Sequence, residues 1–103
     1  MIEEIVSRPI ARYSQWINVF DVGQYVGSHC DAAGDAHLIV PISVPDISHG
    51  GQLWLRNKRN IVPVAVGDIL IFCANAIPHG TTIVSRTAPV QRVSFNMRVW
   101  FDH

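Results

Sequence analysis

The sequence predicts an all-β fold, a sandwich or jelly roll, and three observations carry that prediction. Hydrophobic residues make up 49% of its 103 residues, which suffices for one small core. No stretch keeps the helical spacing of apolar residues beyond a turn or two. Short runs rich in β-branched and aromatic residues instead recur between clusters of Gly, Pro, Asn and Asp. We therefore expect a single all-β domain over residues 1–103.

The first half of the chain contains four extended segments. Residues 13–20 are rich in aromatic and β-branched side chains and end at an Asp-Val-Gly turn. Residues 24–28 form a second extended piece, followed by an Ala-Ala-Gly-Asp loop after position 31. Residues 37–44 are strongly β-prone and end at a Pro- and Gly-containing turn, beyond which residues 52–56 form the fourth strand.

The second half contains four more extended segments. A polar turn leads to residues 61–66, where Pro63 favours an edge position because it has no amide hydrogen to donate. A Gly-Asp turn precedes the apolar run at 69–73. Residues 78–84 and 91–101 complete the set, with a loop between them. About eight short, evenly spaced strands are typical of a sandwich or jelly roll.

Charge and cysteine content exclude several functional classes. Acidic and basic residues balance at eight each, so no net charge attracts the chain to nucleic acid or to an anionic membrane. Two cysteines, Cys30 and Cys73, do not make a disulfide framework. The first five residues do not resemble a signal peptide, and no apolar run is long enough to span a membrane. We expect a soluble, cytoplasmic protein.

A candidate metal site is the tripeptide His29-Cys30-Asp31 with a second histidine, His79. Residues two apart on an extended chain point to the same side, so His29 and Asp31 can reach one point. Two imidazoles and one carboxylate form the facial triad of non-haem Fe(II) enzymes, which leaves the other coordination positions open. We interpret the remaining histidines as solvent-facing or locally hydrogen-bonded; they are His37, His49 and His103.

The last expected strand has two chemically different faces. One parity carries Arg92, Ser94, Asn96 and Arg98, and the other is entirely apolar: Val93, Phe95, Met97, Val99 and Phe101. A guanidinium binds a carboxylate through two parallel charge-assisted hydrogen bonds, and a neighbouring hydroxyl can add a third. The polar face therefore suits a carboxylate ligand.

The order H-x-D, distal His and R-x-S resembles the 2-oxoglutarate and Fe(II)-dependent dioxygenase superfamily. The resemblance spans roughly residues 16–101 and implies a minimal double-stranded β-helix (jelly roll) without the usual N-terminal helices. It implies that His29, Asp31 and His79 bind Fe(II) and that Arg92 with Ser94 binds 2-oxoglutarate. The implied reaction uses O2, decarboxylates 2-oxoglutarate to succinate, and hydroxylates or otherwise oxidises a substrate C–H bond.

Two branches of the superfamily contribute further expectations. Asn18-Val19-Phe20 and the spacing from Arg92 to Arg98 are similar to the N-x-Y and R-x-x-x-x-x-R motifs of DNA-repair dealkylases. This resemblance implies that Asn18 and Arg98 also contact 2-oxoglutarate, whereas Phe20 lacks the tyrosine hydroxyl. The H-x-D motif, Gly50-Gly51 and residues 67–72 equally resemble prolyl hydroxylases.

The apolar parity of the last strand predicts an interaction surface. If Arg92 and Ser94 point inward, the apolar side chains point outward, and the chain has no helices to cover them. We therefore expect a homodimer through this outer face, or a fragment of a longer protein. Without a basic surface, a small-molecule or peptidyl substrate is favoured over nucleic acid.

Two other functions keep the fold. In a cupin-like metalloenzyme that does not use 2-oxoglutarate, Arg92 would bind the carboxylate of the substrate itself. In a non-catalytic β-sandwich module, the protein would have no affinity for added Fe(II). Succinate formation distinguishes the dioxygenase from the cupin-like enzyme, and Fe(II) binding distinguishes both from the module.

Overall fold

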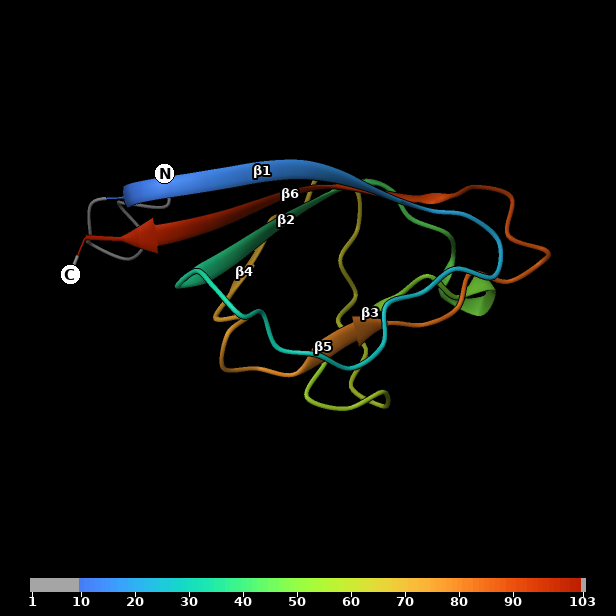
Figure 1. Ribbon diagram of the computed structural model, residues 1–103. Helices are drawn as coiled ribbons and strands as arrows, with labels where there is room; N and C mark the ends of the chain where they lie inside the picture. Colours follow the sequence, from blue (N-terminus) through green and yellow to red (C-terminus); the bar gives the residue numbers. More distant parts are fainter. Residues whose placement is uncertain (1–9, 103) are drawn as a thin grey trace.

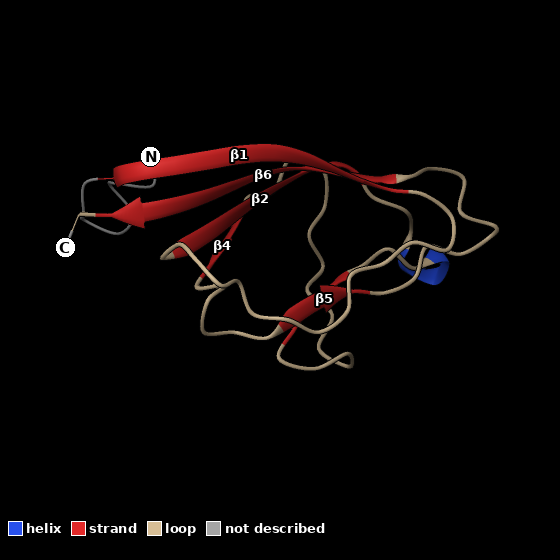
Figure 2. Cartoon of the chain, viewed as in Figure 1, coloured by secondary structure: helices blue, strands red, loops and turns tan. Residues whose placement is uncertain are grey.

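The computed structural model describes residues 10–102, which form six strands and one short helix (Figures 1 and 2). This confirms the all-β fold. The expectations for the first five residues and for His103 lie outside the described range. The elements are β1 (Ile10–Phe20), β2 (Ala36–Ser43), the 3-10 helix η1 (Ile47–His49), β3 (Leu53–Leu55), β4 (Leu70–Phe72), β5 (His79–Thr81) and β6 (Arg92–Phe101).

The strands form two layers. The larger sheet has the antiparallel order β1-β6-β2-β4, and the smaller pairs β3 with β5. Figure 1 shows the small sheet and its loops opposite the large sheet. Isolated bridges from His29 to His79 and from Trp54 to Ile61 widen the small sheet on both sides. The H-x-D segment thereby lies beside β5.

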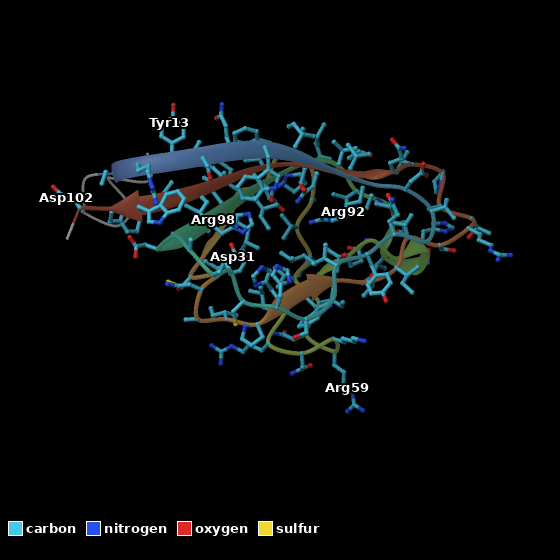
Figure 3. All side chains as sticks on the ribbon, viewed as in Figure 1. Tyr13, Asp31, Arg59, Arg92, Arg98 and Asp102 are labelled. Atoms are coloured by element: carbon cyan, nitrogen blue, oxygen red, sulfur yellow. The ribbon has the colours of Figure 1, made fainter. Side chains whose placement is uncertain are left out.

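The alternating side chains of β6 point to the two opposite faces of the large sheet. Its polar parity points inward, where Arg92 is 6% exposed and Ser94 and Asn96 are each 1% exposed. Figure 3 shows Arg92, Arg98 and Asp31 between the layers, while Tyr13 of β1 projects away from them. The alternation of β6 therefore places polar groups in the space between the two sheets.

Apolar side chains pack on both faces of the large sheet. Between the layers, one cluster combines residues of three strands with the turn after β4: Ile39, Leu53, Phe72 and Ala74. On the outer face, a second cluster centres on Ala36, Leu38 and Val99, with partly buried neighbours Ile10, Val40, Ile71, Phe95, Met97 and Phe101.

The outer face of the large sheet is buried around Val99 and exposed along β1. Val99 is fully buried, so the expectation that every apolar residue of β6 lacks cover is wrong at that position. The cause is that β6 lies between β1 and β2, whose side chains and the larger residues of β6 itself pack around Val99. Along β1 the face remains open, with Tyr13, Ile17 and Val19 each at least half exposed.

Two of the eight expected strands are absent from the described residues. Residues 61–66 contribute one bridge at Ile61, because Pro63 cannot donate to a ladder and the amide of Val64 turns back onto Val62. Residues 24–28 also form no strand, although Val26 exchanges hydrogen bonds with Thr81 through its backbone and the threonine hydroxyl. Within residues 10–102, no helix is long and apolar enough to cross a membrane.

Candidate metal centre

Backbone pairing brings His29, Asp31 and His79 together. The amides of His29 and His79 each donate to the other's carbonyl, at 3.1 and 2.9 Å. The amide of Asp31 donates to the carbonyl of Ala74, in the turn that follows β4. These bonds fix the H-x-D segment between β5 and the end of β4. Two histidines fifty residues apart thus sit side by side.

The two imidazoles have a defined tautomer. His29 Nδ1–H donates to the carbonyl of Gly27, and His79 Nδ1–H donates to that of Ile77, each at 2.9 Å. A carbonyl oxygen can only accept, so Nδ1 carries the hydrogen in both rings. In the neutral rings Nε2 therefore keeps its lone pair, and metal-binding histidines are commonly oriented by such a backbone contact.

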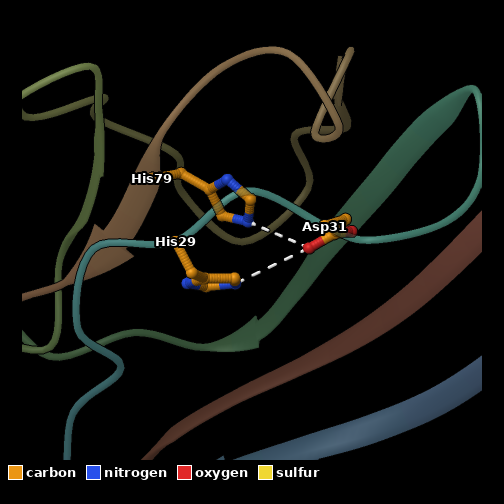
Figure 4. A group of neighbouring side chains, drawn as sticks. All are labelled: His29, Asp31 and His79. Carbon is orange, nitrogen blue, oxygen red and sulfur yellow. Dashed lines mark ion pairs between the residues drawn. The ribbon is translucent and has the colours of Figure 1, made fainter.

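The three ligand atoms converge on one point (Figure 4). Asp31 Oδ1 lies 3.6 Å from His29 Nε2 and 3.4 Å from His79 Nε2, and one ligand atom from each residue lies within 4.8 Å of the others. Three lone-pair donors facing each other with no hydrogen between them repel, and a cation at their centre removes that repulsion. The donor set of two nitrogens and one oxygen fits Fe(II).

Burial lowers the pKa of His79 and so favours its neutral, metal-binding form. Desolvation is the main cause that lowers its pKa below the ordinary histidine value, and the neighbouring His29 acts in the same direction. The hydrogen bond to Ile77 and the charge of Asp31 oppose the shift without reversing it. His79 is therefore neutral at neutral pH, which is the form that binds a metal.

A cavity of about 200 Å³ adjoins the three ligand atoms. Its wall combines β1, β2, β3, β5 and β6 with the segment that carries the H-x-D motif. The lining residues are Trp16, Asn18, Phe20, Val26, His29, Asp31, His37, Ile39, Leu53, His79, Gly80, Thr81, Arg92, Asn96 and Arg98. These residues come from both sheets, so the cavity lies between the two layers.

Arg92 lines this cavity as a buried cation. Its guanidinium lies 5.4 Å from the centre of the Phe20 ring, and desolvation lowers its pKa to about 10. Arg92 is therefore still charged at neutral pH. Among the described residues, no carboxylate forms an ion pair with it within 4.0 Å. A buried guanidinium without an internal counterion favours an anionic ligand.

The other expected 2-oxoglutarate contacts differ in position. Asn18 lines the cavity beside Arg92. Ser94 lines a smaller cavity of about 10 Å³, which Arg92 also borders. The side-chain amide of Asn96 donates to the carbonyl and the hydroxyl oxygen of Ser94, at 3.2 and 3.0 Å. Asn96 lines the larger cavity and Ser94 does not, so the Ser94 hydroxyl contacts a residue of the cavity wall.

Arg98 faces Asp31, one of the three candidate metal ligands. Its Nη2 donates to Asp31 Oδ2 at 3.2 Å, and its guanidinium lies 5.1 Å from the centre of the Trp16 ring. The resemblance to dealkylases implies a contact with 2-oxoglutarate for this residue. Here the carboxylate that it contacts belongs to the protein.

His37 is a site residue that sequence reasoning placed elsewhere. It was expected to be solvent-facing or locally hydrogen-bonded, but it is 6% exposed and lines the cavity, with Nδ1 3.4 Å from Asp31 Oδ2. Its Nε2 contacts Asn96 Oδ1 on the neighbouring strand β6 at 3.0 Å. His37 lies on β2 directly opposite Arg98 of β6, and paired residues share a face of the sheet, so the pairing of the strands places His37 in the site. His49 instead contacts Thr87 near the surface.

Comparisons with known proteins identify the fold. No protein-family model matches the sequence, and no curated protein matches it. Among solved structures, a prolyl-4-hydroxylase from Pseudomonas putida is similar, with a TM-score of 0.77 and 15% identity. The viral collagen prolyl hydroxylase of Paramecium bursaria Chlorella virus 1, in complex with 2-oxoglutarate, has a TM-score of 0.68 and 17% identity. An RmlC-like cupin from Desulfovibrio desulfuricans has a TM-score of 0.56 and 16% identity.

Coverage is nearly complete for this chain and partial for the hydroxylases. The similarity covers 99% of this chain and 58% of the Pseudomonas enzyme, 95% and 65% for the viral enzyme, and 87% and 78% for the cupin. The chain thus spans about three fifths of the length of the two hydroxylases. Its fold is the jelly roll that the sequence predicts, and it shares this fold with the two hydroxylases and the cupin.

Proposed function

We propose that the protein is an Fe(II)- and 2-oxoglutarate-dependent dioxygenase. The observation that carries the proposal is the convergence of His29 Nε2, His79 Nε2 and Asp31 Oδ1 beside a cavity lined by Arg92, a cation without an ion pair among residues 10–102. A metal and a carboxylate ligand are the two components that such an enzyme has to hold next to each other. The similarity to two prolyl hydroxylase folds supports the same function.

The metal site suits oxygenase chemistry because it is not saturated by protein ligands. Three protein ligands on one face leave about three positions of an octahedron for a two-oxygen chelator and for O2. His29 is partly exposed, with 41% of its side-chain surface accessible, whereas the side chains of Asp31 and His79 are 5% exposed. Asp31 and His79 are thus held in the protein interior, and the site is accessible to solvent on the side of His29.

The cavity suits a small dicarboxylate. Its volume of about 200 Å³ lies below the roughly 300–1,000 Å³ of sites for drug-sized ligands. Arg92 would hold the distal carboxylate, and Asn18 lies in the same wall. Phe20 packs on the guanidinium with its ring, so this side of Arg92 offers no competing hydrogen-bond acceptor. The carboxylate of the ligand would act as the counterion that Arg92 lacks among the described residues.

The protein residues and the bound groups have separate tasks. When bound, iron and 2-oxoglutarate supply the oxidising chemistry, which consumes O2 and releases succinate and CO2. The backbone carbonyls of Gly27 and Ile77 orient the two imidazoles, and Arg98 orients Asp31. The apolar lining from Val26, Ile39 and Leu53 limits water around the reacting atoms.

For the substrate we propose a small molecule or a peptide. The two hydroxylases with this fold are named for prolyl substrates, so proline-containing peptides belong in the first panel. The charge balance of the chain gives no support for nucleic acid. We propose, further, that the protein acts in the cytoplasm.

A cupin-like metalloenzyme is the second candidate, because a cupin shares the fold. In that case Arg92 would bind the carboxylate of the substrate directly. Both candidates predict metal binding and a role for Arg92. Only the dioxygenase predicts that 2-oxoglutarate is converted to succinate as substrate is oxidised.

The first test is anaerobic mixing of protein with Fe(II) and 2-oxoglutarate. The dioxygenase is expected to develop a weak visible charge-transfer band, and Arg92→Ala is expected to weaken 2-oxoglutarate binding by about 100-fold, since truncating one partner of a buried charge pair costs 2–5 kcal/mol. The exposed arginine of the loop before β6 gives the control Arg86→Ala, which should bind as the wild type does. Absence of the band, or an unchanged affinity in Arg92→Ala, contradicts the assignment.

A further inference from the structure

Asp31 presents its two carboxylate oxygens to different partners. Oδ1 faces the two imidazole nitrogens, whereas Oδ2 accepts the hydrogen bond from Arg98 at 3.2 Å. The Asp31 side chain is 5% exposed, so water cannot readily take the place of either partner. A hydrogen bond to the second oxygen of a carboxylate favours metal binding through the first oxygen alone.

We propose that Arg98 is a positioning residue that restricts Asp31 to one-oxygen coordination and so keeps three metal positions open. This inference rests on the proposed metal site. A carboxylate can bind a metal through one oxygen or both, and two-oxygen binding would use one more position. Two remaining positions would accommodate a chelating 2-oxo acid and leave none for O2.

Arg98 is held in place from three sides. Its guanidinium contacts Asp31 and lies over the Trp16 ring of β1. The stem of its side chain runs over Gly34, where an added Cβ would overlap Cγ and Cδ of Arg98. Gly34 also adopts φ of +89°, which side chains rarely tolerate. The loop after the H-x-D motif is thus shaped to receive this arginine.

His37 cannot replace Arg98 in this role. The side-chain amide of Asn96 donates to Ser94, which leaves Asn96 Oδ1 as the acceptor that faces His37 Nε2. Nε2 therefore carries the hydrogen, and a neutral His37 presents a lone pair from Nδ1 to Asp31 Oδ2. In agreement, His37 Nδ1 is buried and has no hydrogen-bond partner. Among the described residues, Arg98 is the hydrogen-bond donor to the Asp31 side chain.

The test counts the waters on Mn(II) bound to the whole protein, without 2-oxoglutarate. Proton relaxation of bound Mn(II) is proportional to the number of coordinated waters, which the proposal puts at about three in the wild type and about two in Arg98→Met, a decrease of roughly one third. Arg98→Lys keeps a cation near Oδ2 and should restore the wild-type relaxivity. A purely structural role of Arg98 would not produce this rescue.

A second pair of variants tests the same contact from the opposite side. Gly34→Ala displaces the stem of Arg98 and should lower the relaxivity as Arg98→Met does. Gly67→Ala is the matched control, because Gly67 has φ of +99° and nothing within 4 Å of an added Cβ. It imposes similar backbone strain without touching the site, so its relaxivity should equal that of the wild type.

The outcomes separate this inference from the proposed function. If the wild type does not bind Mn(II), the metal site itself is wrong. If it binds Mn(II) and both Arg98→Met and Gly34→Ala keep the wild-type number of waters, the site stands and the role of Arg98 is overturned. A drop shared by Gly67→Ala would also overturn it, because strain alone would then explain the effect.

Discussion

The candidate site depends on hydrogen-bond directions that individual residues impose. Carbonyls fix the tautomers of His29 and His79, and Asn96 fixes that of His37. The order of the residues in the sequence predicts the H-x-D motif and His79. It does not predict the position of His37 in the site, because this position depends on the pairing of β2 with β6, which are about sixty residues apart in the chain.

The buried histidines predict a pH dependence of stability in the metal-free protein. Desolvation is the largest cause that lowers the pKa of both His37 and His79 in the fold. His37 is faced by Asp31, Arg98 and His79, and His79 by His29 and Asp31. The unfolded chain then binds more protons than the native state below about pH 6.5, the ordinary histidine pKa. The free energy of unfolding should therefore fall as pH decreases through that value.

Urea unfolding between pH 5 and pH 8, with a chelator present, measures this dependence. Each histidine that stays neutral in the fold contributes a slope of up to about 1.4 kcal/mol per pH unit below pH 6.5 and no slope above it. His37→Asn removes one of these groups and should flatten the profile. A stability that is constant, or that rises on acidification through this range, disagrees with the burial of both rings.

At the scale of elements, the two strands that the sequence predicts best are β2 and β6. β2 and β6 begin and end within one residue of the expected limits. In β6 the polar and apolar residues alternate over residues 92–99, and in β2 a strongly β-prone run ends at a Pro- and Gly-containing turn. Segments 24–28 and 61–66 have strand-like composition but lack a partner over their full length. Composition alone cannot show this, because strand pairing is decided by residues far away in the sequence.

The alternation of β6 predicts different costs for two valines on the outer face. Val99 is fully buried against Ala36 and Leu38, so Val99→Ala should lower the free energy of unfolding by about 2 kcal/mol through lost contacts and a small cavity. Val19 of β1 is 50% exposed, and Val19→Ala should change stability by about 0.5 kcal/mol or less. Chemical denaturation of both variants checks the difference. Equal losses would mean that Val99 is not part of a packed cluster.

At the scale of the whole molecule, we propose that the open part of the outer face binds a second copy of the chain. The inward-facing parity holds the charges of β6, and the outer parity of the paired strands β1 and β6 is uncharged: Tyr13, Gln15, Ile17, Val19, Val93, Phe95, Met97 and Val99. A second copy presents the same uncharged surface, so packing the two together buries no charge. This makes a homodimer the occupant that the face suits best.

Light scattering at micromolar concentration tests the homodimer. The wild type should have twice the mass of one chain, and Ile17→Arg should be monomeric because it would bury a charge at the contact. Val66→Arg is the control, since Val66 is 64% exposed in a loop between β3 and β4. A monomeric wild type, or equal dissociation by both variants, argues against this interface.

The candidate metal ligands belong to different layers of the molecule, and this predicts an effect of a bound metal on stability. His79 lies on the small sheet, whereas Asp31 is tied to β6 of the large sheet through Arg98. An ion bound between them would link the two sheets, and it would stabilise the native state because the unfolded chain lacks this site. At one hundred times the dissociation constant it should add about 2.7 kcal/mol to stability, visible as a higher melting temperature that a chelator reverses. Iron supply would then govern how much intact protein persists, in addition to how fast it turns over.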